Sequence, residues 1–182
     1  YSIAAPHAKG KSAEDNIFAA NNRAIALAKE IGVENVTNAT VGSILDEDGS
    51  LVVLDVVKQE LKNLTPPEFC AYAPIKGYDE FLKDCIDQCF GKSRPEGYID
   101  ACATPGGTGV LHHVVHNYSE PGDEVLITDW HWGAYDSLID DNNRKVRTFS
   151  FLTSDGHFNA ASFKENVEDI LKKQDNIVII LN

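Results

Sequence analysis

Residues 104–135 read TPGGTGVLHHVVHNYSEPGDEVLITDWHWGAY, and this stretch decides the fold class. Two adjacent glycines open a mostly apolar run that is long enough for a helix, and the turn SEPGDE separates it from a short apolar run at 124–129. Trp130 and Trp132 follow that run directly. A helix followed by a short apolar strand is typical of a βαβ unit in a parallel sheet.

The same alternation continues on both sides of this stretch. The expected strands are 97–104, 125–129, 145–152 and 176–181, and the expected helices between them are 107–118, 133–142 and 159–173. Upstream we expect helices at 12–32, 53–64 and 78–91, with Ser12 as a cap of the first, a turn at 45–49 and a loop at 65–77. Regular alternation predicts an α/β fold with three layers, α/β/α, in which helices cover both faces of a mostly parallel sheet.

The glycine turn at the start of the expected helix 107–118 is a candidate anion site. Gly106 and Gly107 allow a tight turn, and the amides of the first helical turn have no intrahelical acceptor, so they and the helix dipole favour an anion there. Thr108 adds a hydroxyl donor. On the glycines alone, an ordinary strand–helix turn remains the alternative interpretation.

The tryptophans favour the binding interpretation. Parallel strands end at one edge of a sheet, where open α/β sheets place their ligands, so Trp130 and Trp132 belong to the same edge as the glycine turn. An indole can present a flat face to an aromatic ligand. Hydrogen-bond donors for a phosphate and a flat indole face for a ring together predict a binding site for an aromatic phosphate ester.

Two other glycine motifs are excluded. A dinucleotide-binding fingerprint requires glycine at position 112, where His112 stands. The tripeptide Gly91-Lys92-Ser93 lacks the upstream glycine of a P-loop, since Ile86 occupies that position, and it follows a helix rather than a strand.

Composition excludes several further classes of function. The net charge of −12 argues against a nucleic-acid partner, which requires clustered lysine and arginine. No apolar window is long enough to span a membrane, and the start of the sequence lacks the pattern of a signal peptide, so we expect a soluble, cytoplasmic protein with reduced thiols. Cys85 and Cys89 lack the partners of a zinc site, and the acidic turn at 46–48 lacks the pattern of a calcium loop, so no metal is expected.

Several segments, taken in order, resemble the first half of a class I aminotransferase, a fold-type I pyridoxal-phosphate enzyme of the aspartate aminotransferase group. The similar segments are DNIFAANNRA at 15–24, NATVGSILDEDGSLVVL at 38–54, YAPIKGYDEF at 72–81, GGTGVL at 106–111 and GDEVLITDWHWGAY at 122–135. Each is weak by itself, but their order and spacing cover nearly the whole chain.

The resemblance implies that pyridoxal 5'-phosphate is the cofactor. It implies that Gly106, Gly107 and Thr108 bind its phosphate and that Trp132 stacks on its pyridine ring, while Trp130 packs. Gly106 stands where the family often has serine, which removes one hydroxyl donor but leaves the amide. Metal ligands are not implied.

The resemblance also implies a shared site. Tyr72 would reach the phosphate of the neighbouring subunit's cofactor, which makes the protein a homodimer with shared active sites. Gly42 would lie near the carboxylate of the substrate, an amino acid or a 2-oxo acid. Residues 1–45 would be an N-terminal arm and helix of the small domain, and residues 46–182 the first part of the large cofactor-binding domain.

The family's catalytic residues are not found in this sequence. None of its lysines matches the one that forms the Schiff base, so we expect an N-terminal half that is inactive alone and part of an aminotransferase when full length. A pyridoxal-phosphate-dependent lyase on the same fold and a non-catalytic cofactor-binding scaffold remain alternatives. His131 and the three histidines at 112, 113 and 116 are expected to be structural, and Tyr135 is a candidate for lining the pocket.

Overall fold

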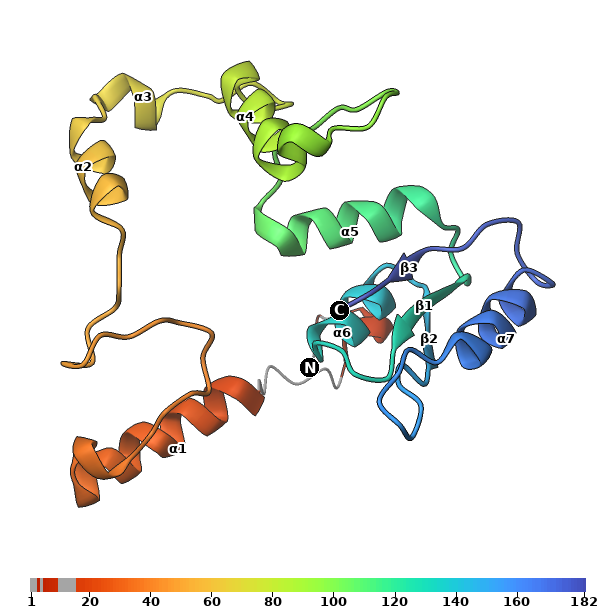
Figure 1. Ribbon diagram of the computed structural model, residues 1–182, viewed down its shortest axis with the longest axis horizontal. Helices are drawn as coiled ribbons and strands as arrows, with labels where there is room; N and C mark the ends of the chain where they lie inside the picture. Colours follow the sequence, from red (N-terminus) through yellow and green to blue (C-terminus); the bar gives the residue numbers. More distant parts are fainter. Residues whose placement is uncertain (1–2, 4, 10–15) are drawn as a thin grey trace. The chain divides into compact units, whose positions relative to one another are not determined.

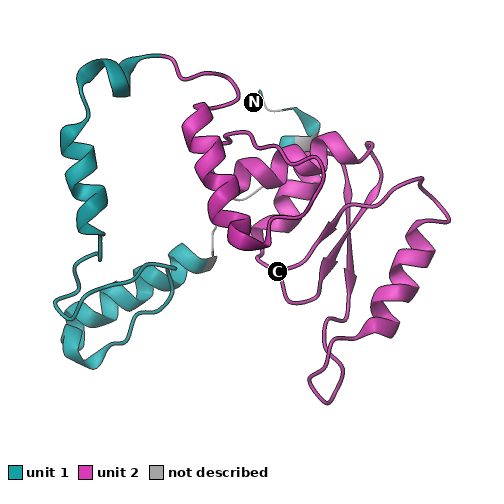
Figure 2. Cartoon of the chain, turned by 45° about the horizontal axis from the view of Figure 1, so that its top comes forward, with its two compact units in different colours: residues 1–71 teal, residues 72–182 magenta. Residues whose placement is uncertain are grey.

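The computed structural model describes residue 3, residues 5–9 and residues 16–182 (Figure 1). The chain divides into two compact units, Tyr1–Ala71 and Tyr72–Asn182 (Figure 2). The predicted domain boundary after residue 45 stays a prediction, because compactness within this chain does not report domain membership in a longer one. The expected cap Ser12 lies outside the described residues.

Unit 1 is helical. Its elements are η1 (Pro6–Ala8), α1 (Asn16–Ile31), η2 (Val33–Asn35), α2 (Asp55–Asn63) and α3 (Pro66–Cys70). Helix α1 ends at Ile31, and Gly32, which the sequence predicted to close it, follows with a φ of 96° that suits glycine. The predicted turn at 45–49 is also present, closed by a bridge between Leu45 and Leu51.

Helix α3 corrects the expectation of a loop at 65–77. The amide and hydroxyl of Thr65 donate to the Glu68 carboxylate at 2.7 and 2.6 Å, and prolines occupy the first helical positions. This capping box satisfies donors at the helix start, where proline costs no hydrogen bond. The same two hydrogen bonds, the hydroxyl's first, lower the pKa of Glu68 below its usual value. The composition of the segment indicated a loop, but the T-x-x-E spacing decides its structure.

Unit 2 contains a parallel sheet of three strands. They are β1 (Glu124–Thr128), β2 (Lys145–Phe149) and β3 (Ile179–Ile180), in the order β2-β1-β3. The register of β1 and β2 runs from Glu124 opposite Lys145 to Thr128 opposite Phe149. The helices of this unit are α4 (Asp79–Phe90), the short η3 (Gly91–Ser93), α5 (Gly106–Tyr118), α6 (Ala134–Asp141) and α7 (Ala160–Ile170).

Alternate residues of β1 pack on opposite faces of the sheet. Val125 and Ile127 belong to a cluster with residues of α5 and α6, whereas Leu126 belongs to a second cluster with Phe149 and Ile170 at the end of α7. This period of two is what a strand buried on both sides requires. The α/β fold with three layers is therefore confirmed (Figure 1).

The expected strand at 97–104 is not a strand in the structure. The segment is irregular and mostly exposed, and one backbone hydrogen bond, from the Ala103 amide to the Lys76 carbonyl at 2.7 Å, holds its end. A strand requires a neighbouring strand to pair with, and sequence pattern alone cannot supply one. The third and fourth expected strands are present but shorter, as β2 and β3.

Candidate functional site

The start of α5 lies at the carboxyl edge of the sheet. Helix α5 has 13 residues and β1 has 5, so they extend about 20 and about 17 Å. Because a short turn joins them, α5 runs back along β1 and its N-terminus reaches the edge where β1 and β3 end (Figure 1). The loop from β1 to α6, which carries both tryptophans, leaves from that same edge.

The turn into α5 requires glycine at its first position. Gly106 has a φ of 66°, in the left-handed region that other residues rarely adopt. The Thr104 hydroxyl donates to the Gly106 carbonyl at 2.9 Å, and the Gly106 amide donates to the Thr104 carbonyl at 2.7 Å. A Cβ atom built on Gly106 or Gly107 would meet nothing within 4 Å. The backbone is thus fixed and the space beside it is open.

The donors at this turn suit an anion. Within the described part of the chain, the amides of Gly107 and Thr108 have no acceptor, as expected for a first helical turn. The helix dipole adds partial positive charge, and the Thr108 side chain adds a hydroxyl. Two free amides, a hydroxyl and open space fit a phosphate group, so the residues present match the predicted cofactor at this end.

Gly109 is a site residue that the sequence analysis missed. A Cβ atom there would lie 2.7 Å from Pro105 Cδ and 3.3 Å from Thr104 Cβ, so only glycine lets the helix pack on its own entry turn. A glycine inside a helix costs about 1 kcal/mol relative to alanine. Because a glycine within a helix carries this cost, the third glycine of the run indicates that the helix packs closely at this position.

Thr108 faces a hollow of about 510 Å³ between α5 and α6. Its lining residues are Pro105, Thr108, Gly109, His112, His113, Ala134, Ser137, Leu138 and Asp141. Trp132 is not one of them. The structure therefore brings the anion donors and the indole to one sheet edge without placing them in this hollow together.

The two tryptophans differ in their surroundings. Trp132 is 41% exposed and meets the ring of buried Tyr135 edge-on, with 5.7 Å between ring centroids and 85° between planes. Trp130 is 67% exposed, so the packing expected for it is not found within this chain. Of the two, Trp132 has the orientation fixed by a neighbouring ring.

The roles assigned to Tyr72 and Gly42 are not tested by the geometry within either unit. Tyr72 is fully exposed in the segment that joins α3 to α4. Gly42 belongs to unit 1, where a Cβ atom on it would meet nothing within 4 Å. Their assigned roles stay predictions.

The histidines have structural partners. His112 and His116 stack at 6.0 Å on the exposed side of α5, and His112 Nδ1 lies 3.1 Å from the Asn142 amide nitrogen. His131 is held at both ring nitrogens, by the Thr128 carbonyl at 2.8 Å and by the Asp136 carboxylate at 3.3 Å. These contacts give His131 a fixed place in the loop that carries Trp132.

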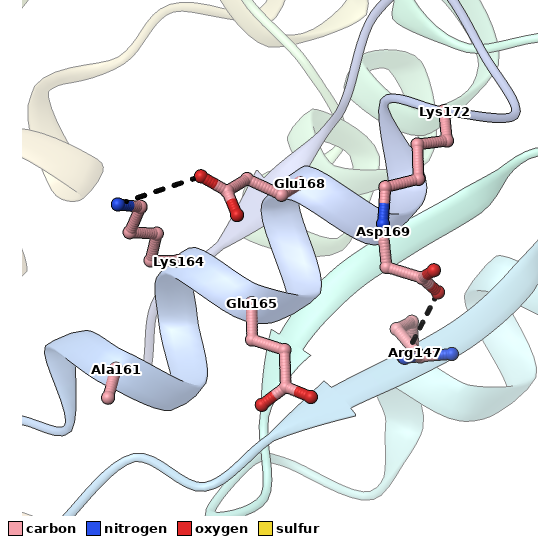
Figure 3. A pocket seen from close by; sticks show the side chains of 7 residues that line it. All are labelled: Arg147, Ala161, Lys164, Glu165, Glu168, Asp169 and Lys172. Carbon is pink, nitrogen blue, oxygen red and sulfur yellow. Dashed lines mark hydrogen bonds and ion pairs between the residues drawn. The ribbon is translucent and has the colours of Figure 1, made fainter.

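A second hollow lies over α7 and β2 (Figure 3). Because α7 packs on the face of the sheet opposite to α5 and α6, this hollow and the one beside Thr108 lie on opposite faces. Charged side chains line it, and several of them are paired: Lys164 with Glu168 at 3.7 Å and Arg147 with Asp169 at 3.5 Å. Because these pairs neutralise charge and the Arg147–Asp169 pair joins α7 to β2, we assign this hollow a structural role.

Fold and site together describe an α/β sheet covered on both faces, with a glycine turn that carries free amide donors and a tryptophan loop at its carboxyl edge. The protein-family model for aminotransferase class I and II matches residues 34–182, and the chain belongs to this family. The resemblance seen in the sequence is thereby confirmed.

Solved structures of aminotransferases share the fold. The chain is 34% identical to an aminotransferase from Anaerococcus prevotii, with a TM-score of 0.93 over 98% of this chain and 44% of that one. An aromatic amino acid aminotransferase from Psychrobacter sp. B6 (21% identity, TM-score 0.67, 94% and 43% coverage) and a broad-specificity aminotransferase from Leishmania mexicana (20%, 0.66, 88% and 40%) support the fold alone.

The chain spans less than half the length of these three structures. No curated protein matches its sequence at a significant level. In the part of the chain that the structure describes, no helix has the length and apolar character needed to cross a membrane.

Proposed function

We propose that this chain carries the phosphate-anchoring and ring-stacking part of a pyridoxal-phosphate-dependent aminotransferase, which moves an amino group between an amino acid and a 2-oxo acid. The observation that carries the proposal is the set of free donors at Gly107 and Thr108, on the same sheet edge as Trp132. Membership of the aminotransferase family supports it.

Each residue of the site has a defined task in this proposal. The amides of Gly107 and Thr108 and the Thr108 hydroxyl bind the phosphate, whereas the Gly106 amide, which was also expected to bind it, donates to the Thr104 carbonyl and sets the turn. The helix dipole contributes about 0.3–1 kcal/mol to the binding free energy of the phosphate, and up to about 2 kcal/mol when the site is partly buried. The hydrogen bonds must supply the rest of that binding free energy. Trp132 stacks on the ring, which contributes about 0.5–1.5 kcal/mol beyond the burial of area.

Pyridoxal phosphate, when bound, supplies an electron sink for the substrate's α-carbon. This chain's residues bind and orient it, and we assign none of them a catalytic proton transfer. We propose that Gly42 lies near the substrate carboxylate and that Tyr72 completes the site of a neighbouring subunit in a homodimer. The full exposure of Tyr72 leaves its side chain free for such a contact.

The test is a half-reaction on the whole polypeptide. We expect it to bind pyridoxal phosphate and, with an amino acid alone, to convert the cofactor to its amine form while releasing one equivalent of 2-oxo acid. Release of ammonia or of a side-chain fragment would instead identify a lyase. Cofactor binding without either reaction would identify a scaffold, and absence of binding would overturn the proposal.

Substitution of Trp132 tests its assigned role. We expect Trp132→Ala to weaken cofactor binding about tenfold, because the stacking contribution of up to about 1.5 kcal/mol is lost. Trp130→Ala is the matched control and should leave the dissociation constant unchanged, since Trp130 is the more exposed indole. Equal effects of both substitutions, measured by equilibrium titration, would contradict the assignment.

A further inference from the structure

Tyr135 links several groups at the carboxyl edge of the sheet. It lies in the first turn of α6, is 9% exposed, and belongs to the apolar cluster on the α5 and α6 face of the sheet. Its hydroxyl donates to Asn182 Oδ1 at 3.1 Å, and its amide donates to the Trp132 carbonyl at 2.9 Å. The residue thus contacts the tryptophan loop and the residues that follow β3.

The ring of Tyr135 has a neighbour on two sides. Trp132 meets it edge-on at 5.7 Å, and His131 stacks nearly parallel to it at 6.3 Å, with 13° between planes. His131 is itself fixed by the Thr128 carbonyl and the Asp136 carboxylate. Edge-to-face contacts of this kind are directional, so a fixed Tyr135 ring limits the rotation of the indole.

The hydroxyl of Tyr135 also determines which atoms Asn182 offers. Because the hydroxyl donates to the side-chain oxygen, the amide nitrogen of Asn182, with two N–H donors, points away from Tyr135. Asn182 is the second residue after the end of β3, so these donors lie at the carboxyl edge.

We infer that Tyr135 is a positioning residue, whose ring orients the indole of Trp132 and whose hydroxyl orients the carboxamide of Asn182 at one sheet edge. The effect on ligand binding rests on the proposed function. A planar ligand with a polar substituent would stack on the oriented indole of Trp132 and accept a hydrogen bond from the oriented carboxamide of Asn182. The positioning itself does not depend on any ligand.

Two substitutions separate the two parts of this role. Tyr135→Phe removes the hydroxyl and keeps the ring, whereas Tyr135→Leu removes both. Tyr118→Phe and Tyr118→Leu are the matched controls, because Tyr118 is an exposed tyrosine at the end of α5. Near-ultraviolet circular dichroism and thermal melting establish that each variant of the whole polypeptide is folded.

The first readout needs no ligand. In nitrogen-15 NMR spectra, the Trp132 indole and Asn182 side-chain signals are assigned by their loss in Trp132→Phe and Asn182→Ala. We expect Tyr135→Phe to shift only the Asn182 signals, and Tyr135→Leu to shift and broaden both sets. An unchanged Trp132 signal in Tyr135→Leu, or unchanged Asn182 signals in Tyr135→Phe, would overturn the inference.

The second readout is the affinity for pyridoxal phosphate. We expect Tyr135→Phe to weaken binding a few-fold and Tyr135→Leu about tenfold, with both Tyr118 variants unchanged. If the unsubstituted protein fails to bind the cofactor, the proposed function fails while the NMR result still decides the positioning role. If it binds and Tyr135→Leu binds equally well, the inferred effect on ligand binding is wrong.

Discussion

At the scale of single residues, Arg144 is the buried charge on which the end of α5 depends. Its side chain is 7% exposed, and its guanidinium donates to Ser119 Oγ at 3.0 Å, to the His116 carbonyl at 3.2 Å and to the carbonyls of Ser119 and Asn142. The last carbonyls of a helix lack intrahelical partners, and a cation near them also complements the helix dipole. Arg144 supplies both the hydrogen-bond donors and the positive charge at the turn that joins α5 to the sheet.

We therefore expect Arg144→Ala to lower the free energy of unfolding by about 2–3 kcal/mol, because it leaves buried acceptors without donors. Arg144→Lys should recover only part of this, since an ammonium group lacks the planar fork of donors. Urea denaturation measures both values. Arg23→Ala, an exposed control, should stay within about 0.5 kcal/mol, and an equal effect of the two alanine variants would refute the capping role.

Local residues could be predicted from the sequence, and this long-range one could not. Gly106 and Thr108 are recognisable because a glycine turn and a helix start are encoded within a few neighbouring positions. The Arg144 side chain reaches Ser119 across 25 positions of sequence, and no periodicity or motif connects the two. Tyr135 is intermediate: its proximity to Trp132 follows from helical spacing, but its bond to Asn182 does not.

At the scale of elements, an ion pair fixes the segment between α4 and α5. Lys76 Nζ lies 2.7 and 2.9 Å from the two carboxylate oxygens of Asp100. The hydrogen bond from Lys76, followed by those from the Ala101 amide and the Tyr98 hydroxyl, lowers the pKa of Asp100 from 3.8 to about 2. The same contact raises the pKa of Lys76. The pair joins two irregular segments in place of a strand ladder.

This ion pair predicts a pH dependence with a definite sign. Because the folded-state pKa of Asp100 is depressed, the stabilisation is complete above the unfolded value of 3.8 and is lost as the pH falls toward about 2. We expect Lys76→Met to move the Asp100 titration toward 3.8, measured from the carboxyl carbon-13 shift. Lys83→Met removes the cation next to Asp87 and should leave Asp100 unchanged. An unshifted Asp100 in Lys76→Met would contradict the prediction.

The elements that the sequence predicted best are those whose stability is local. Helices α4 to α7 fall within a few residues of their expected bounds because amphipathic periodicity encodes them, and the Asn159 side chain also caps α7. The strand expected at 97–104 was wrong because pairing is a property of two segments, and β-like composition specifies only one of them. Helix α3 was missed because its proline-rich composition masked a capping box.

At the scale of the whole molecule, burial is distributed unequally between the two units. Every buried hydrophobic side chain of the described chain belongs to unit 2. In unit 1, apolar residues of α2 such as Val56 and Leu61 are each 63% exposed. The sequence predicted a helix at 53–64, but it did not predict that the apolar side chains of this helix would be exposed. Fold class and family were recognisable because they depend on the order of motifs.

This asymmetry predicts two levels of protection against hydrogen exchange in the chain of residues 1–182. Amides of Val125, Leu126 and Ile127 lie in a fully buried strand paired on both sides, so their exchange requires the largest opening of the structure. Amides of α2 lack buried neighbours and should exchange many times faster, near the rates of an unstructured chain. Mass spectrometry of peptides from both regions measures the ratio. Equal protection of α2 and β1 would show that unit 1 has a core of its own, because local burial sets the free energy of local opening.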